Sequence, residues 1–379
     1  MRSMTLVVWL AVCGAVIGPM ACDDGGGDAG TDGGTDSDSD TDSDSDSDTD
    51  TDSVVCNDEC WEGLFDVKSA GGVATLAPYK CITGSLRVVD TSLTTLELPC
   101  LESVSEDLEI AENDSLTSLA GLSALTSVEM WLSIEENSAL TNLDGLSALT
   151  SVGWSIGISA NPVLTNLDGL TGLTEVEGGL SIGSNASLTN LGGLNSITSV
   201  EALLSVGNNP VLTNLDGLSA LTSVGGNLDI HGNAALTSLE GLSALTSAYR
   251  DLKIEDNDSL ISLAGLEALT SVGGELDIIG NAALTSLEGL SALTLVYGAY
   301  IGMGYSRGLY IEDNAVLTSL DGLSALTSVG GELGFSNNLV LPYCEICDFL
   351  YQLEYWPDSV GAQDNLADSC WVDDALTCP

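Results

Sequence analysis

Residues 211–234 read VLTNLDGLSALTSVGGNLDIHGNA, and copies of this segment make up most of the chain. The copies follow one another at a spacing of 24 residues, with one spacing of 33, and a weaker copy begins at Ser92. Their first residues are Ser115, Ala139, Val163, Ser187, Val211, Ala235, Ser259, Ala283 and Val316. Self-similarity at this period predicts a solenoid, in which each repeat stacks on its neighbours.

Each copy contains three short apolar pairs, here Leu212/Leu215, Leu221/Val224 and Leu228/Ile230. The last pair alternates with a period of two, which indicates a strand with one buried face. The other two are rich in β-branched residues and bounded by glycine, and we predict strands there too. Each repeat is thus predicted to be one turn of a three-sided coil. Because parallel crossovers are almost always right-handed, we expect an all-β, right-handed parallel β-solenoid of about eleven coils.

An asparagine stands five residues after the start of the last strand in every copy. The column comprises Asn113, Asn137, Asn161, Asn185, Asn209, Asn233, Asn257, Asn281, Asn314 and Asn338. Stacking would bring these amides to a spacing of roughly 4.8 Å, where they can bond along a ladder and to the turn backbone. We therefore predict that the column faces inward and satisfies buried backbone groups.

The pattern L-x-x-L-x-G-L-x-x-L-x-x-V-G-G-x-L-x-I-x-x-N resembles the receptor L-domain family and, more loosely, leucine-rich repeats. The resemblance covers about residues 81–343. That family includes the ligand-binding L domains of the insulin and EGF receptors and anchored fungal cell-wall proteins. The resemblance implies a β-solenoid used for recognition at surfaces, and it identifies no ligand.

The N-terminus has the features of an exported lipoprotein. An apolar run from Leu6 to Gly18 is too short to span a bilayer, so residues 1–21 are predicted to be a signal peptide. Cys22 follows a small residue and is the predicted lipid-attachment site, with Cys13 as the rival acceptor and simple cleavage after Ala21 as the alternative. Residues 22–53 are almost entirely Asp, Ser, Thr and Gly, which predicts a disordered spacer rather than a calcium-binding loop.

The charge of the chain excludes some partners. The formal net charge is −49, and residues 54–379 hold 43 acidic against 6 basic side chains. Such an excess argues against nucleic acid or an anionic membrane surface as a partner. Contact with a membrane is expected only through the lipid anchor.

The cysteines that remain after Cys13 and Cys22 form two sets of four, one on each side of the repeats: Cys56, Cys60, Cys81 and Cys100, then Cys344, Cys347, Cys370 and Cys378. In an exported protein we interpret them as disulfides that close the ends of the solenoid, with the pairing left open. We expect an N-terminal cap with the first strand at 54–91, the solenoid at 92–341 and a C-terminal cap at 342–379. A helix within residues 344–356 should cover the last rung.

Enzymatic signals are weak. The only histidine, His231, is expected on an exposed turn, and the G-x-S-x-G match at 179–183 puts Ser181 in mid-strand. We predict no enzyme, no cofactor and no metal site. Polysaccharide lyases built on β-helices keep a carbohydrate-cleaving alternative open.

Departures from the repeat gather at the corner before the last strand, where the consensus has two glycines. The nine-residue insertion lies there, within 297–308, and the three basic residues found between 101 and 343 all lie within three coils of that corner. We predict a ligand-binding cluster of Tyr249, Arg250, Lys253, Tyr297, Tyr300, Met303, Tyr305, Arg307 and Tyr310. Lys253, Asp277 and Tyr310 should occupy one outward position in successive coils. The alternative is that these residues pack the base of the insertion.

Trp131 and Trp154, at the same corner of adjacent coils, form a second candidate edge that suits stacking against sugars. The leading interpretation is a surface-tethered, non-enzymatic recognition or adhesion protein of the bacterial envelope that binds a protein or a glycan. The alternatives are a carbohydrate-binding or polysaccharide-cleaving β-solenoid, and a structural component of the envelope without a discrete ligand.

Overall fold

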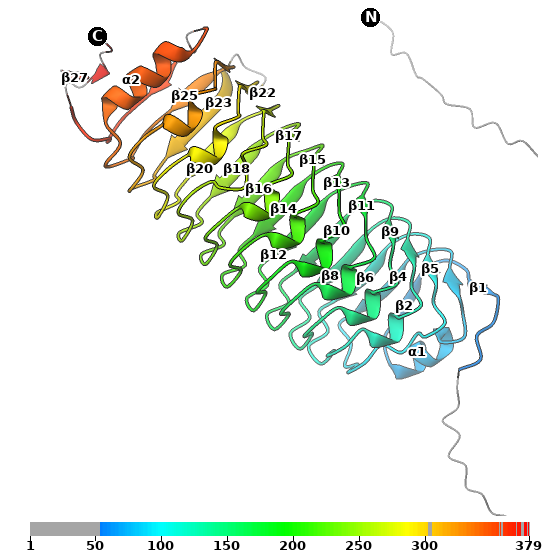
Figure 1. Cartoon of the computed structure of the whole chain (residues 1–379). Helices are drawn as coiled ribbons and strands as arrows, with labels where there is room; N and C mark the ends of the chain where they lie inside the picture. Colours follow the sequence, from blue (N-terminus) through cyan, green and yellow to red (C-terminus); the bar gives the residue numbers. More distant parts are fainter. Residues whose placement is uncertain are drawn as a thin grey trace, which may run out of the picture. The chain divides into compact units, whose positions relative to one another are not determined.

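The computed structural model describes residues 54–301, 305–355, 357, 359–368, 370–372, 375, 376 and 378. The predicted signal peptide, Cys22, the acidic spacer and Met303 lie outside these residues. The compact unit at 52–379 is a stack of coils with α1 (Ala70–Leu76) at one end and α2 (Tyr343–Gln352) at the other (Figure 1). The predicted parallel β-solenoid is confirmed. No helix in the described residues has the length and apolarity needed to cross a membrane.

The main sheet follows the solenoid from end to end, and each coil contributes one parallel strand in register with the next. Its strands, in spatial order, are β2 (Phe65–Val67), β4 (Leu86–Val89), β6 (Leu108–Ala111), β8 (Leu132–Glu135), β10 (Ile156–Ser159), β12 (Leu180–Gly183), β14 (Leu204–Gly207), β16 (Leu228–His231), β18 (Leu252–Glu255), β20 (Leu276–Ile279), β23 (Tyr305–Glu312), β25 (Glu332–Gly334) and β26 (Val360–Gly361). In a typical strand the first and third residues, such as Leu228 and Ile230, point inward, so the second and fourth form an outer face.

Two-residue strands form a second side of the coil, in two consecutive parallel sheets. The first sheet contains β1 (Cys60–Trp61), β3 (Cys81–Ile82), β5 (Ser103–Val104), β7 (Ser127–Val128) and β9 (Ser151–Val152). The second contains β11 (Glu175–Val176), β13 (Ser199–Val200), β15 (Ser223–Val224), β17 (Ser247–Ala248), β19 (Ser271–Val272), β21 (Leu295–Val296) and β24 (Ser328–Val329).

The third side differs from the prediction. Leu212 and Leu215 are not in a strand; irregular backbone leads instead into one 3₁₀ turn. These turns are η1 (Ala120–Leu122), η2 (Asp144–Leu146), η3 (Asp168–Leu170), η4 (Gly192–Leu194), η5 (Asp216–Leu218), η6 (Glu240–Leu242), η7 (Glu288–Leu290) and η8 (Asp321–Leu323). The physical reason is the spacing of three residues between successive buried leucines, which does not fit the two-residue alternation of a strand; only the segment at Asp216–Leu218 closes into a 3₁₀ turn.

The core is a continuous column of leucine, isoleucine and valine. In the repeat at 211–234 every inward apolar side chain is at most 1% exposed: Leu212, Leu215, Leu218, Leu221, Val224, Leu228 and Ile230. Burial of each contributes about 1.5–3 kcal/mol relative to exposure. Close stacking also explains the glycine of each 3₁₀ turn, because a Cβ on Gly217 would lie 1.9 Å from the backbone oxygen of Leu191.

The predicted asparagine ladder is confirmed, and all of its members are fully buried. In a typical step, the backbone N–H of Asn209 donates to Oδ1 of Asn233 (3.1 Å), and Nδ2 of Asn209 donates to the oxygen of Ile182 (3.0 Å). The ladder extends beyond the predicted column: Thr91 donates to Asn113 at one end, and Asn338 donates to Oδ1 of Asn365 at the other.

Disulfides close both ends, as predicted, and pair Cys56–Cys100, Cys60–Cys81, Cys344–Cys370 and Cys347–Cys378. Within the N-terminal cap, β2 pairs with β4 and so adds a strand to the main sheet. At the other end α2 packs Phe349 against Phe335, with ring centroids 5.7 Å apart, while β26 adds a further strand beside β25. These disulfides indicate folding in an oxidising, extracytoplasmic environment. The short antiparallel pair β27 (Trp371–Val372) and β28 (Ala375–Leu376) ends the chain.

Candidate functional site

The insertion forms a hairpin at the corner of the solenoid. β22 (Ala299–Ile301) pairs antiparallel with the first half of β23, whose second half continues the main sheet. Tyr249 and Tyr297 are 64% and 62% exposed beside it. The side chains of Tyr300 and Tyr305, like all of Met303, lie outside the described part of the molecule.

Ion pairs bind the hairpin to the sheet. Arg307 lies 3.5 Å from a carboxylate oxygen of Glu275 and 4.0 Å from one of Asp277, and Lys253 approaches Asp277 at 3.6 Å. Lys253, Asp277 and Tyr310 do share the outward position of successive strands. The guanidinium carbon of Arg307 also lies 4.2 Å from the centre of the Tyr310 ring, a cation–π contact. The charges of Lys253 and Arg307 are therefore compensated within the chain.

The acids around this hairpin are largely desolvated. Asp277 is 1% exposed, and neither of its carboxylate oxygens accepts a hydrogen bond from the described residues. Burial raises the pKa of Glu275, and the neighbouring charge of Asp277 raises it further. Burial likewise raises the pKa of Glu255 and of Glu312. The arrangement resembles a packed ionic cluster more than an open contact surface.

Arg250 differs from the other two cations. It is exposed and makes no ion pair with any described residue. It borders a hollow of about 400 Å³ whose other walls include Leu203, Asn227 and Asp229. Burial raises the pKa of Asp229, while Lys253 opposes that shift.

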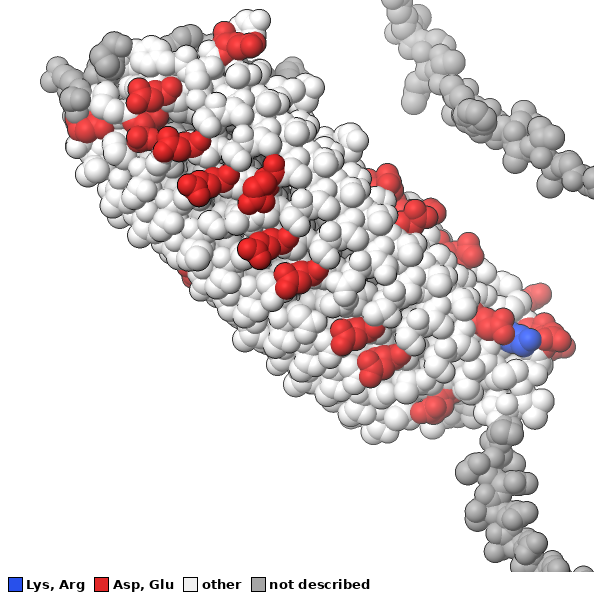
Figure 2. All heavy atoms as spheres, in the orientation of Figure 1, with Lys and Arg blue, Asp and Glu red and all other residues white. Residues whose placement is uncertain are grey.

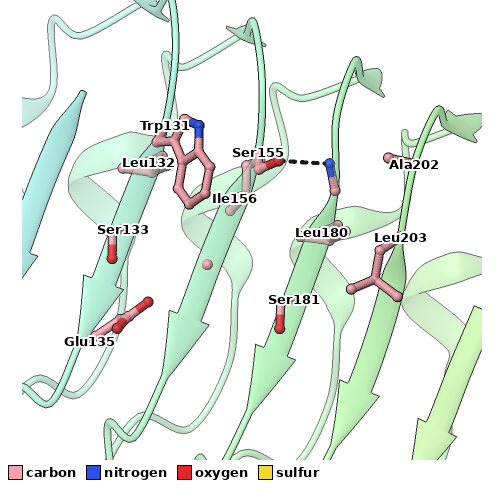
Figure 3. A pocket seen from close by; sticks show the side chains of 12 residues that line it. Trp131, Leu132, Ser133, Glu135, Ser155, Ile156, Leu180, Ser181, Ala202 and Leu203 are labelled. Carbon is pink, nitrogen blue, oxygen red and sulfur yellow. Dashed lines mark hydrogen bonds between the residues drawn. The ribbon is translucent and has the colours of Figure 1, made fainter. Parts of the chain in front are cut away.

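Trp131 of the second candidate edge lines a hollow of about 310 Å³ on the outer face of β8, β10 and β12 (Figure 3), whereas Trp154 is not among the lining residues. The Trp131 ring forms one wall and Leu203 stands opposite it. The floor consists of Ser133, Gly157 and Ser181, which are paired across successive strands and are small, so the space between the walls stays open. A volume of this size is at the lower end of the range for ligand sites.

Local contacts hold the aromatic wall in place. The backbone N–H of Trp131 donates to Oδ1 of Asp107 at 3.2 Å, and the Trp131 and Trp154 rings lie 6.4 Å apart at an angle of 52°. Both tryptophans remain 52% exposed. Beside the wall, Ser155 Oγ accepts the backbone N–H of Gly179 (2.9 Å), which is drawn as a dashed line in Figure 3.

The two hollows adjoin on the outer face of the sheet, with Ala202 and Leu203 lining both, and we term them together the main-sheet groove. It extends from Trp131 to Arg250. Sequence reasoning had singled out its two ends, but it missed Leu203, Gly157 and Ser181. The sequence does contain a signal for the small floor residues. The second residue of each main-sheet strand faces outward, and from β8 to β14 this residue is always serine or glycine.

The structure bears on the other sequence motifs as well. Ser181 lies within β12 and not at a strand-to-helix turn. His231 is the last residue of β16 and is half-buried, so the expectation of an exposed turn was wrong; the strand continues one residue beyond Ile230, and the imidazole covers Gly207. Cys344 and Cys347 of the C-x-x-C motif each pair with a different cysteine.

Acidic side chains follow the length of the face shown in Figure 2, whereas basic ones are sparse on it. No protein-family model matches the sequence, and no curated protein shows significant similarity to it. The fold and the groove define a repeat protein similar to leucine-rich repeats, a parallel β-solenoid of ~24-residue coils with a buried asparagine ladder.

Proposed function

We propose that this chain is a non-enzymatic recognition protein of the bacterial cell envelope that binds an external ligand, a glycan or a protein, in the main-sheet groove. The observation that carries the proposal is the open space between Trp131 and Leu203 over a floor of small residues. A half-exposed tryptophan beside such a hollow is typical of a contact site. The likeness of the repeat to receptor L domains favours recognition as well.

The scaffold suits this role because it is rigid and uniform. The asparagine ladder and the leucine column fix every coil to its neighbours, so the outer side chains keep their relative positions without a ligand. Such preorganisation reduces the entropic cost of binding. The insertion hairpin is the second candidate site, and the exposed Tyr249 and Tyr297 beside it are the residues that favour it.

The binding experiment compares two leucine substitutions. Gly157→Leu fills the groove, and the only atom within 4 Å of a Cβ there is Glu135 Oε1, at the end of a flexible side chain. Ser223→Leu is the matched control on the second side of the coil, where Leu295 occupies the corresponding position of another repeat. Immobilised protein is presented to a glycan array and to purified envelope proteins. The proposal requires a ligand that the parent and Ser223→Leu retain and that Gly157→Leu loses.

Tethering is tested separately. We propose that Cys22 carries lipid and that the acidic spacer holds the solenoid away from the membrane. Cys22→Ser should move the protein from the membrane fraction to the soluble fraction and abolish lipid labelling. Labelling that persists in this variant would favour Cys13 or another route of attachment.

A further inference from the structure

Resting on the proposed function, we infer that the occupant of the main-sheet groove is an uncharged oligosaccharide that lies across the strands, with one sugar ring on Trp131 and the chain continuing towards Arg250. The apolar wall is the first reason. A pyranose ring presents C–H groups on its faces and hydroxyls around its rim. The exposed Trp131 ring offers a flat apolar surface to one face, and Leu203 lines the far side of this hollow, next to the second hollow.

The floor supplies the complementary polar groups. Ser133 and Ser181 carry hydroxyls that both donate and accept, at positions separated by two strand spacings of roughly 4.8 Å. Ser155 Oγ accepts the N–H of Gly179, which leaves its own hydrogen available to a ligand. The Glu135 carboxylate reaches over the floor from the strand end (Figure 3) and accepts hydrogen bonds only. A ligand rich in hydroxyls matches this mixture.

Charge argues against an acidic ligand. The residues that line the hollow between Trp131 and Leu203 include one carboxylate, Glu135, and no cation. Residues 54–379 carry 43 acidic against 6 basic side chains, and this field repels polyanions such as uronate polymers. An uncharged ligand avoids that repulsion.

A peptide fits this surface less well. Strand addition needs a free sheet edge, whereas β8, β10, β12 and β14 each pair on both sides. An amphipathic helix needs a continuous apolar floor, and here the floor is serine and glycine. These two modes of peptide recognition are therefore disfavoured.

The length of the groove indicates an oligosaccharide rather than a single sugar. Trp131 and Arg250 belong to coils five strand spacings apart, or roughly 24 Å. At the far end the Arg250 guanidinium, with five donors, and the Asn227 amide border the second hollow. These groups offer further hydrogen bonds to the hydroxyls of a chain that extends beyond the first hollow.

Isothermal titration of the purified protein tests this inference. The probes are cellohexaose, xylohexaose, maltohexaose, laminarihexaose, mannohexaose and the hexamer of N-acetylglucosamine, with the matching dimers and with hexagalacturonate as the acidic comparison. We expect at least one neutral hexamer to bind, with its dimer and hexagalacturonate weaker by at least about tenfold. Trp131→Ala should weaken binding by at least about tenfold and Gly157→Leu should abolish it, while Ser223→Leu binds as the parent does.

The outcomes separate the two proposals. If no neutral hexamer binds at millimolar concentration, or if hexagalacturonate binds more tightly, the oligosaccharide inference is wrong. The proposed function survives that result if a purified protein ligand is captured by the parent and not by Gly157→Leu. If a ligand of either kind binds equally to Gly157→Leu and the parent, both proposals fail. Melting curves of every variant establish that each is folded.

Discussion

Asn209 and Asn233 of neighbouring coils are joined by two hydrogen bonds to a single oxygen. The backbone N–H and Nδ2 of Asn209 both donate to Oδ1 of Asn233, at 3.1 and 3.4 Å. Nδ2 of Asn233 in turn donates to the backbone oxygen of Val206 at 2.9 Å. One side chain therefore satisfies two buried backbone groups of the preceding coil.

Replacement of this asparagine should destabilise the fold. Asn233→Ala leaves the buried N–H of Asn209 without its acceptor and removes one donor to the oxygen of Val206, so we expect a loss of about 1–3 kcal/mol in the free energy of unfolding. Asn214→Ala is the control, because this half-buried amide bonds only to Thr213 Oγ1 and to the N–H of Asp216, within its own coil and near the surface. Urea denaturation measures both variants. Equal stability of Asn233→Ala and the parent would show that the ladder does not stabilise the solenoid.

The close stacking of 3₁₀ turns predicts a second contrast. A Cβ on Gly217 would lie 1.9 Å from the oxygen of Leu191, whereas a Cβ on Gly157 meets only a flexible carboxylate oxygen at 3.1 Å. Gly217→Ala should therefore cost about 1–3 kcal/mol or more, because coils must separate to accept the methyl group. Gly157→Ala should change the melting temperature little. Similar melting temperatures for the two variants would contradict the stacking account.

Buried acids near the hairpin predict a pH effect. Burial raises the pKa of Glu255 above its ordinary value of 4.5, so the folded protein takes up a proton where the unfolded chain is still ionised. Stability is gained as the pH falls through the raised pKa, and it is lost as the pH rises through the same window. Glu255→Gln should therefore be more stable than the parent at neutral pH and should approach it below about pH 4.5. Melting curves across this pH range measure the difference, with Glu240→Gln, a change at an exposed residue, as the control. A Glu255→Gln variant that is less stable than the parent at neutral pH would contradict the prediction.

Two arginines at the same corner should behave differently. Arg307 pairs with Glu275 and Asp277, and its removal leaves the buried Asp277 with Lys253 alone. Because Arg307 is about one-third exposed, we expect Arg307→Met to cost about 2 kcal/mol rather than the full value of a buried pair. Arg250→Met should stay within about 0.5 kcal/mol of the parent. If denaturation shows no loss of stability for Arg307→Met, Arg307 is not needed to hold the insertion hairpin in place. The hairpin would then be the better candidate for the ligand-binding site than the main-sheet groove.

The sequence was sufficient for the parts of the fold that repeat. The asparagine column and the period-two strand are visible in every copy, and both are confirmed. The third side was mistaken because a spacing of three between leucines such as Leu212 and Leu215 was interpreted as a strand. Thr91 and Asn365 could not be predicted as ladder residues because their segments diverge too far from the repeat consensus. Each nevertheless stands five residues after its strand begins.

The site was harder to predict because the hollow depends on the absence of large side chains from part of the outer face. Trp131 attracted attention as a departure from glycine, but the hollow beside it exists because Gly157 and Ser181 are small. The sequence analysis also grouped Arg250 with Lys253 and Arg307, because a sequence indicates which coils lie close together but not which side chains form ion pairs. Only the geometry shows that Lys253 and Arg307 share Asp277 while Arg250 borders the groove.

A crystal structure of the protein with the tightest-binding neutral oligosaccharide tests the central claim most directly. The account predicts a sugar ring stacked on Trp131, with the chain crossing Gly157 and Ser181 towards Leu203. An ordered oligosaccharide bound elsewhere, for example against the hairpin or on the second side of the coil, with the groove empty, would contradict it.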